Sequence, residues 1–115
     1  MYLQRRSISK YNAKSTIYNG IIYHSKKEAG RAQELDLLLK AKEIKKWERQ
    51  IPIDLKVNGE HICKYYVDFK VTDKHGIIIW EEVKGFMTEV YRLKRKIFEA
   101  TYLKEHPDEE YVVIT

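Results

Sequence analysis

The sequence predicts a single α/β domain in which helices cover a β-sheet of mixed strand direction. Helical patterns begin near Ser25 and Thr88, on either side of a region rich in β-branched and aromatic residues. Two Asn-Gly pairs, at 19–20 and 58–59, each lie between strand-like runs and favour the type I′ turns of β-hairpins. A strand-like run also follows the second helical pattern, at residues 111–114. Helices and strands packed around one core make a layered α/β fold.

The first predicted elements are a short hairpin and a helix. Residues 16–18 and 21–23 are the strands of the hairpin. Ser25 and Glu28 form a capping-box pattern that opens a helix running to about residue 41. Glu28 therefore lies in the first turn, on the side that faces the sheet. The apolar stripe of this helix consists of Ala32, Leu35 and Leu39, is widened by Leu38 and has Glu28 at its start.

A second hairpin and a third strand form the centre of the predicted sheet. The strands of this hairpin span residues 44–57 and 60–72, and Pro52 assigns the first of them to an edge or bulged position. A turn at residues 73–76 leads to a third strand that ends at Lys84.

The second predicted helix and the last strand complete the domain. Thr88 caps this helix, which runs from about residue 89 to residue 105 and ends before Pro107. Its predicted apolar stripe is Val90, Leu93, Ile97 and Ala100, flanked by Phe98.

The composition agrees with one globular domain. Of 115 residues, 43% are hydrophobic and 34% are charged. No apolar run approaches the ~20 residues of a membrane span, and the N-terminus lacks the apolar core of a secretion signal. Cys63 is the single cysteine, which excludes an internal disulfide and Cys-based zinc sites. A cytoplasmic location is therefore expected, without a membrane partner.

The positive charge is concentrated at the N-terminus. Residues 1–27 hold six basic and no acidic side chains, whereas the rest of the chain holds 16 basic and 17 acidic ones. Residues 1–14 are predicted to be a flexible arm, followed by one domain at 15–115. Such a region attracts phosphate backbones without reading sequence, and the alternative is a basic terminus without a partner. Its basic residues are Arg5, Arg6, Lys10, Lys14, Lys26 and Lys27.

Asp68, Glu82 and Lys84 are the candidate site residues of the central strands. Side chains alternate between the two faces of a strand, so pairing of these strands places Asp68 beside Glu82 and Lys84. Two carboxylates in a partly buried setting repel each other, and a hard divalent cation such as Mg²⁺ removes that cost. The alternative is an exposed ribbon with ordinary cross-strand charge pairs. Glu28 also has two interpretations, as a carboxylate delivered to this site or as a helix cap.

This order of elements and residues resembles the PD-(D/E)xK nuclease superfamily, in particular its small phage-type members and the archaeal Holliday-junction resolvases. The resemblance covers residues 16–115, and its motifs are SKKEA at 25–29, YVDF at 66–69 and EVKG at 82–85. Val67 stands where the motif has proline, and Glu81 offers a second carboxylate beside Glu82. The spacing to Lys84 favours Glu82.

The resemblance implies a restriction-endonuclease-like αβββαβ core and Mg²⁺-dependent hydrolysis of DNA, with Mn²⁺ as a substitute ion. The implied enzyme is a structure-selective endonuclease of phage-type recombination, repair or replication, in the cytoplasm of a bacterial host. Junction resolution would need two active sites on one two-fold axis and hence a homodimer. A non-catalytic nucleic-acid-binding module on the same fold is the alternative.

The resemblance also implies roles for individual residues. Arg92, Lys94 and Arg95 of the second helix are expected to bind DNA together with the N-terminal basic residues. The expected active site consists of Asp68, Glu82 and Glu28 as metal ligands, Lys84 beside the attacking water, and Gln50 and Lys94 at the border.

Overall fold

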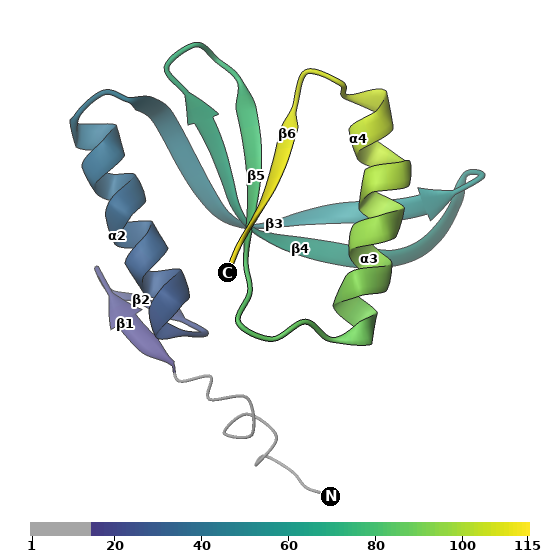
Figure 1. Ribbon diagram of the computed structural model, residues 1–115, viewed down its shortest axis with the longest axis horizontal. Helices are drawn as coiled ribbons and strands as arrows, with labels where there is room; N and C mark the ends of the chain where they lie inside the picture. The colour runs from purple at the N-terminus through teal and green to yellow at the C-terminus, as the bar shows by residue number, and fades with distance from the viewer. Residues whose placement is uncertain (1–14) are drawn as a thin grey trace, which may run out of the picture.

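A four-stranded mixed sheet forms the centre of the computed structural model, which describes residues 15–115 (Figure 1). The first three strands are antiparallel, and the last pairs with the third in parallel. The predicted α/β class and mixed sheet are thus confirmed. In sheet order the strands are β3 (Ile44–Val57), β4 (Glu60–Asp73), β5 (Ile78–Val83) and β6 (Glu110–Ile114).

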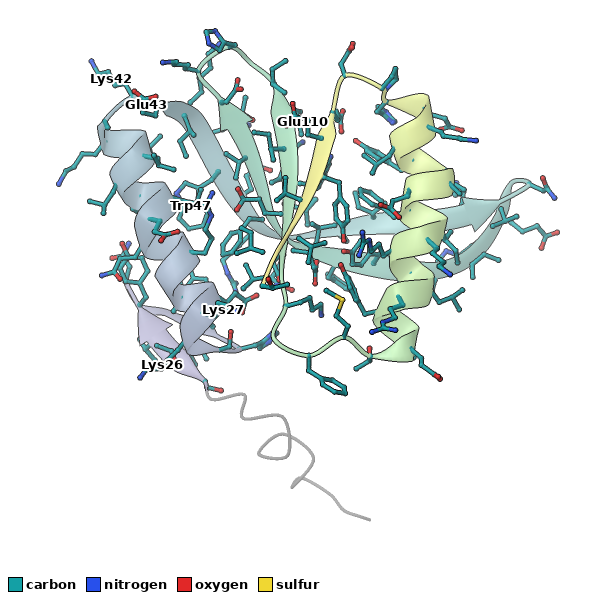
Figure 2. The ribbon with its side chains drawn as sticks, in the orientation of Figure 1. Lys26, Lys27, Lys42, Glu43, Trp47 and Glu110 are labelled. Carbon is teal, nitrogen blue, oxygen red and sulfur yellow. The ribbon has the colours of Figure 1, made fainter. Side chains whose placement is uncertain are left out.

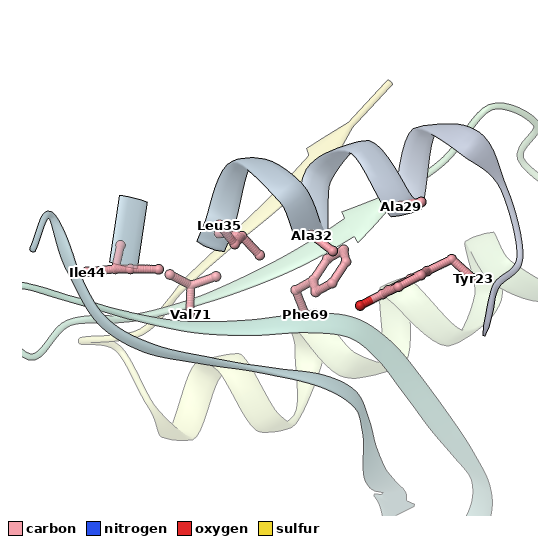
Figure 3. Packing of buried hydrophobic residues seen from close by; sticks show 7 residues of the cluster. All are labelled: Tyr23, Ala29, Ala32, Leu35, Ile44, Phe69 and Val71. Carbon is pink, nitrogen blue, oxygen red and sulfur yellow. The ribbon is translucent and has the colours of Figure 1, made fainter. Parts of the chain in front are cut away.

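Two helices cover different parts of this sheet (Figure 1). The helix α2 (Lys26–Lys40) packs on one end of the sheet, where Leu35 lies over Phe69 and Val71 (Figure 3). The helix α3 (Glu89–Ala100) covers the opposite face of the sheet at β5, where Phe98 packs with Trp80. A short helix, α4 (Tyr102–Glu105), follows α3. No helix of the described part of the chain is long and apolar enough to cross a membrane.

The long β3–β4 hairpin changes direction near its middle (Figure 1). At this point Gln50 of β3 has a φ of +51°, a left-handed conformation that is uncommon for a residue with a side chain. As a result, one face of β4 serves both cores. Phe69 packs in the core under α2, whereas Tyr65 and Val67 pack in the core under α3. Asp68 lies between these two parts of the strand.

The predicted turns and the edge strand are confirmed. A separate two-stranded sheet consists of β1 (Thr16–Tyr18) and β2 (Ile21–Tyr23). Both residues of each Asn-Gly pair have positive φ, as type I′ turns require: 52° and 79° at 19–20, and 52° and 81° at 58–59. Pro52 lies in β3, which is an edge strand.

The buried face of α2 begins as predicted but ends differently. Ala32 and Leu35 are fully buried and Leu38 packs against them. The prediction for Leu39 was wrong, because this side chain is 40% exposed and Ala29 is buried instead. With Glu28 and Ala29 both buried, the stripe is widest at the N-terminal end of the helix, where it meets the sheet.

The predicted buried face of α3 was wrong at Val90, Leu93 and Ala100, whereas Ile97 and the flanking Phe98 pack in the core as predicted. Val90 and Leu93 are 63% and 60% exposed, and the buried side chains are Tyr91 and Phe98. The reason is size, because aromatic rings remove more apolar surface from water in the space between helix and bent hairpin. The single helix predicted for 89–105 is broken at Thr101, whose Oγ1 donates to the carbonyl of Ile97 at 2.6 Å.

Candidate carboxylate site

Asp68 and Glu82 meet on one face of the sheet, as the alternation of side chains predicts. Phe69 of β4 is paired with Glu81 of β5, so Asp68 and Glu82 take the next position on the opposite face. The backbone N–H of Val83 donates to Asp68 Oδ2 at 2.8 Å, which fixes that carboxylate against β5. Asp68 and Glu82 are only 9% and 3% exposed. The sheet therefore holds two buried carboxylates side by side.

Lys84 and Tyr65 hold the two oxygens of Glu82. Lys84 Nζ lies 3.2 Å from Glu82 Oε2. The hydroxyl of Tyr65 donates to Glu82 Oε1 at 2.9 Å. Lys84 Nζ also lies 4.5 Å from the ring centroid of Tyr91, a cation–π contact that limits the positions of the ammonium. One cation therefore borders the two carboxylates.

Glu28 joins the site through Gln50. Gln50 Nε2 lies 3.2 Å from Asp68 Oδ1 and 3.5 Å from Glu28 Oε2. Gln50 was expected only at the border, and in the structure its amide bridges two of the three carboxylates. The backbone of Gln50 is left-handed at the position where its side-chain amide lies between Asp68 and Glu28.

Glu28 also caps the start of α2, in a different way from the predicted box. Ser25 is the N-cap, and its Oγ accepts from the backbone N–H of Glu28 at 3.1 Å, as predicted. The carboxylate of Glu28 accepts from the backbone N–H of His24 at 2.9 Å, not from that of Ser25. One oxygen of Glu28 is therefore a cap, and the other faces the site.

Burial and charge raise the pKa of both central carboxyl groups. The pKa of Asp68 is raised to about 8, first by burial and then by the neighbouring Glu28 and Glu82, against the opposing effect of the Val83 N–H. The pKa of Glu82 is also raised by burial, although Lys84 and Tyr65 act in the opposite direction. Carboxyl groups perturbed in this way are concentrated at functional sites, and structural networks produce them too.

Glu81, the other carboxylate of the EE pair, lies on the opposite face. Arg31 of α2 binds both of its oxygens, through Nε at 2.8 Å and Nη2 at 2.7 Å. This bidentate pair is a strong link between helix and sheet, and it satisfies Glu81 fully. Glu82 is therefore the residue that shares the face of Asp68, as its spacing to Lys84 predicts.

A cleft of about 490 Å³ connects this centre to solvent. Glu28, Asp68 and Lys84 line its inner part. Lys26 and Lys27 also line the cleft and are exposed, so they form its rim at the start of α2, where Figure 2 labels them. The rim is therefore basic and the inner part is acidic, with one ammonium between them.

The other predicted basic residues lie elsewhere. Arg92 and Arg95 line a separate hollow beside α3, and Arg95 Nε is 3.6 Å from a carboxylate oxygen of Glu99. Within residues 15–115, no hydrogen bond or ion pair joins Lys94 to the carboxylates, because α3 turns Tyr91 toward Lys84 instead. Four further residues lie outside the described part of the chain: Arg5, Arg6, Lys10 and Lys14.

The donor chemistry of the centre suits a hard divalent cation. Asp68 and Glu82 offer carboxylate oxygens, and their mutual repulsion is what a cation would offset. Residues 15–115 contain no group of three or more His, Cys, Asp or Glu side chains arranged to hold a metal ion. The adjacent carboxylates of Asp68 and Glu82 are therefore the candidate side-chain ligands for such an ion. A ligand role for Glu28 stays a prediction.

Sequence reasoning missed the role of Tyr65. Alternation along β4 places Tyr65 on the face opposite Asp68, yet its hydroxyl reaches Glu82. The change of direction at Gln50 brings the two together, because it turns the far half of the hairpin toward β5 and α3. Pro52, next to this point, was the available signal of an irregular strand.

A family model described as "Protein of unknown function (DUF1064)" matches residues 8–108. The match includes every residue of the carboxylate site. The comparisons with curated proteins and with solved structures found no match.

Proposed function

The chain belongs to the DUF1064 family. We propose that it is a Mg²⁺-dependent deoxyribonuclease of the PD-(D/E)xK type. The observation that carries the proposal is the meeting of Asp68, Glu82 and Lys84 on one face of the sheet, where Asp68 and Lys84 line a cleft with a basic rim. The order of helix, three antiparallel strands, helix and parallel strand supports it, since it is the order that the resemblance implies.

Asp68 and Glu82 would hold the ion, with the carbonyl of Val83 as a further ligand. When bound, Mg²⁺ supplies Lewis-acid stabilisation of the negative charge that builds on the phosphoryl oxygens. Lys84 has two tasks in this proposal. Its ammonium orients the attacking water, and it stabilises negative charge in the transition state. Contacts with Glu82 and the ring of Tyr91 prepare it for both tasks before substrate binds.

Glu28 and Gln50 extend the centre on the side of α2. The amide of Gln50 restrains Asp68 and stands between Asp68 and Glu28. In the proposal, Oε2 of Glu28, which Gln50 contacts at 3.5 Å, anchors a water molecule or holds a second ion. This role is compatible with the cap to His24, because the cap uses only Oε1.

The proposed substrate is DNA. Lys26 and Lys27 on the rim would contact the phosphate backbone, which carries the negative charge that such residues attract. Selectivity for branched or flapped DNA, and the homodimer that junction resolution would require, belong to the same proposal.

The experiment is incubation with a panel of labelled DNAs: single strand, duplex, nicked duplex, flap and four-way junction. Each is incubated with Mg²⁺, with Mn²⁺ and with a chelator. We expect cleavage only with a divalent ion, and most rapidly on a branched substrate. Asp68→Asn should lose activity, while Glu60→Gln, on the exposed tip of the β3–β4 hairpin, should keep it.

Binding without cleavage in either ion would contradict the enzyme. It would favour the non-catalytic nucleic-acid-binding module instead. Cleavage that survives in Asp68→Asn would show a contaminating nuclease or a different active site.

A further inference from the structure

We propose that the hydroxyl groups of Tyr91, Tyr111 and Tyr65 form a directed hydrogen-bond chain that positions Glu82 and Lys84 for metal binding and catalysis. The three tyrosines are positioning residues, since they act through Glu82 and Lys84. The inference rests on the proposed nuclease function and adds a set of residues to it.

The hydrogen-bond chain of the three tyrosines ends at Glu82 of the carboxylate site. Tyr65 OH donates to Glu82 Oε1 at 2.9 Å, and Tyr65 OH lies 2.7 Å from Tyr111 OH. Tyr111 OH lies 2.8 Å from Tyr91 OH. The three residues come from β4, β6 and α3, so four elements meet once β5 with Glu82 is included. Tyr65 and Tyr91 are buried, and Tyr111 is partly buried.

The hydrogen bond from Tyr65 to Glu82 fixes the direction of this chain. The Tyr65 hydroxyl donates its one proton to Glu82, so the Tyr65 oxygen accepts from Tyr111. Since the Tyr111 proton is then used, Tyr111 accepts from Tyr91. All three protons therefore point toward Glu82, and successive hydrogen bonds of one direction strengthen one another.

The rings that carry the three hydroxyl groups are packed together. The ring centroids of Tyr65 and Tyr91 lie 6.3 Å apart. Phe98 restrains the rings, with centroids 5.4 Å from Tyr65 and 5.2 Å from Tyr111.

The chain closes on Lys84. The ring of Tyr91 lies 4.5 Å from Lys84 Nζ, and that ammonium lies 3.2 Å from Glu82 Oε2. Each oxygen of Glu82 is therefore held, Oε1 through tyrosine hydroxyls and Oε2 through Lys84. Groups that orient a metal ligand in this way commonly affect metal affinity by about 10–100-fold.

The test compares four tyrosine-to-phenylalanine variants. Tyr65→Phe, Tyr111→Phe and Tyr91→Phe each remove one hydroxyl of the chain. Tyr102→Phe is the matched control, because its hydroxyl donates to Glu109 at 2.8 Å outside the carboxylate site. Binding of Mg²⁺ and Mn²⁺ is measured by calorimetry without DNA, thermal melts are recorded with a chelator, and kcat is measured with saturating metal and DNA.

We expect Tyr65→Phe to weaken metal binding about 10-fold or more and to lower kcat. Tyr111→Phe and Tyr91→Phe should have smaller effects in that order, and Tyr102→Phe should bind metal as the wild type does. The double variant Tyr65→Phe/Tyr91→Phe should be no worse than Tyr65→Phe, because both changes interrupt one chain. Should Tyr65→Phe not fold, Tyr111→Phe interrupts the chain at its next link.

Three different results would overturn the inference. If the wild type binds metal and cuts DNA, and Tyr65→Phe does both equally well, the chain is only structural and the nuclease stands. If the wild type neither binds a divalent ion nor cuts DNA, the proposed function fails and the inference with it. Additive effects in the double variant would also overturn the chain as a unit.

Discussion

Burial and the neighbouring carboxylates both disfavour the ionised form of Asp68. In an unfolded chain its carboxyl titrates near its usual value, about 3.9. In the folded protein, burial, Glu28 and Glu82 raise the pKa to about 8. The folded state therefore binds more protons than the unfolded state between these two values. The stability associated with this proton is complete below about pH 4 and is lost as the pH rises through about 8.

The difference between the pKa of Asp68 in the folded and unfolded states predicts how the stability of the metal-free protein depends on pH. The wild-type Tm, measured with a chelator, should fall from pH 5 to pH 8.5, and Asp68→Asn should reduce that fall and melt higher at pH 8. Asn keeps an oxygen that accepts from the Val83 N–H. The exposed Asp108→Asn is the control and should retain the wild-type slope. Identical slopes for wild type and Asp68→Asn would contradict this assignment.

The variant Glu28→Gln distinguishes the two roles assigned to Glu28, which are to cap α2 and to bind an ion or an ordered water. Glu28→Gln retains an oxygen for the His24 N–H, so α2 should begin normally and the metal-free Tm should be equal or higher. The variant loses the charge that a divalent ion or an ordered water needs. We expect a large loss of cleavage and weaker Mg²⁺ affinity, measured by cleavage assay and by melts with and without Mg²⁺.

Full activity in Glu28→Gln would remove Glu28 from the active site. The centre would then consist of Asp68, Glu82 and Lys84, and Glu28 would be a helix cap alone.

At the scale of elements, local signals predicted the strands well and the contacts between elements less well. The Asn-Gly turns and the alternation of β4 and β5 were enough to bring Asp68 and Glu82 to one face, because these are local properties. For the left-handed backbone of Gln50 the only local signal is Pro52, which marks an irregular strand but not the position or direction of the bend, since tertiary contacts such as that of Gln50 with Asp68 accompany it. The contact of Tyr65 with Glu82 depends on it and was therefore missed.

The contacts of α3 were also predicted incompletely from the sequence, and the orientation of this helix on the sheet can be tested directly. Phe98 is fully buried between α3 and the sheet, whereas Leu93 is 60% exposed. Phe98→Ala should lower the free energy of unfolding by about 3–5 kcal/mol. Leu93→Ala, on the face that the sequence pattern favours, should change it by less than about 0.5 kcal/mol. Urea unfolding measures both, and a larger decrease for Leu93→Ala would show that α3 has the opposite orientation.

At the scale of the whole molecule, charge is divided between a basic N-terminal region and a nearly neutral domain. The net charge of +5 arises within residues 1–27, where Lys26 and Lys27 border the cleft. An electrostatic approach of DNA from this side would bring its backbone to the carboxylates. The basic region would then supply affinity for DNA, and the sheet would supply the chemistry.

Deletion of residues 1–14 tests that division, since it removes four basic side chains and no site residue. We expect weaker DNA binding and a shallower dependence of log affinity on log salt, by up to about 0.9 for each phosphate that these side chains neutralise. Cleavage at saturating DNA should persist. Binding titrations at several salt concentrations measure the slope, and an unchanged slope would show that these residues do not touch the backbone.

The most direct test of the proposed active site is the cleavage rate of Lys84→Ala on branched DNA in Mg²⁺. Lys70→Ala is the matched control, because Lys70 Nζ also lies over an aromatic ring, 5.4 Å from the centroid of Trp80, without an ion pair to Glu82. We predict that Lys84→Ala loses about 100-fold or more in rate while its DNA affinity and Tm stay near those of the wild type. Lys70→Ala should cut normally. A Lys84→Ala protein that cuts at the wild-type rate would contradict the assignment of the active site.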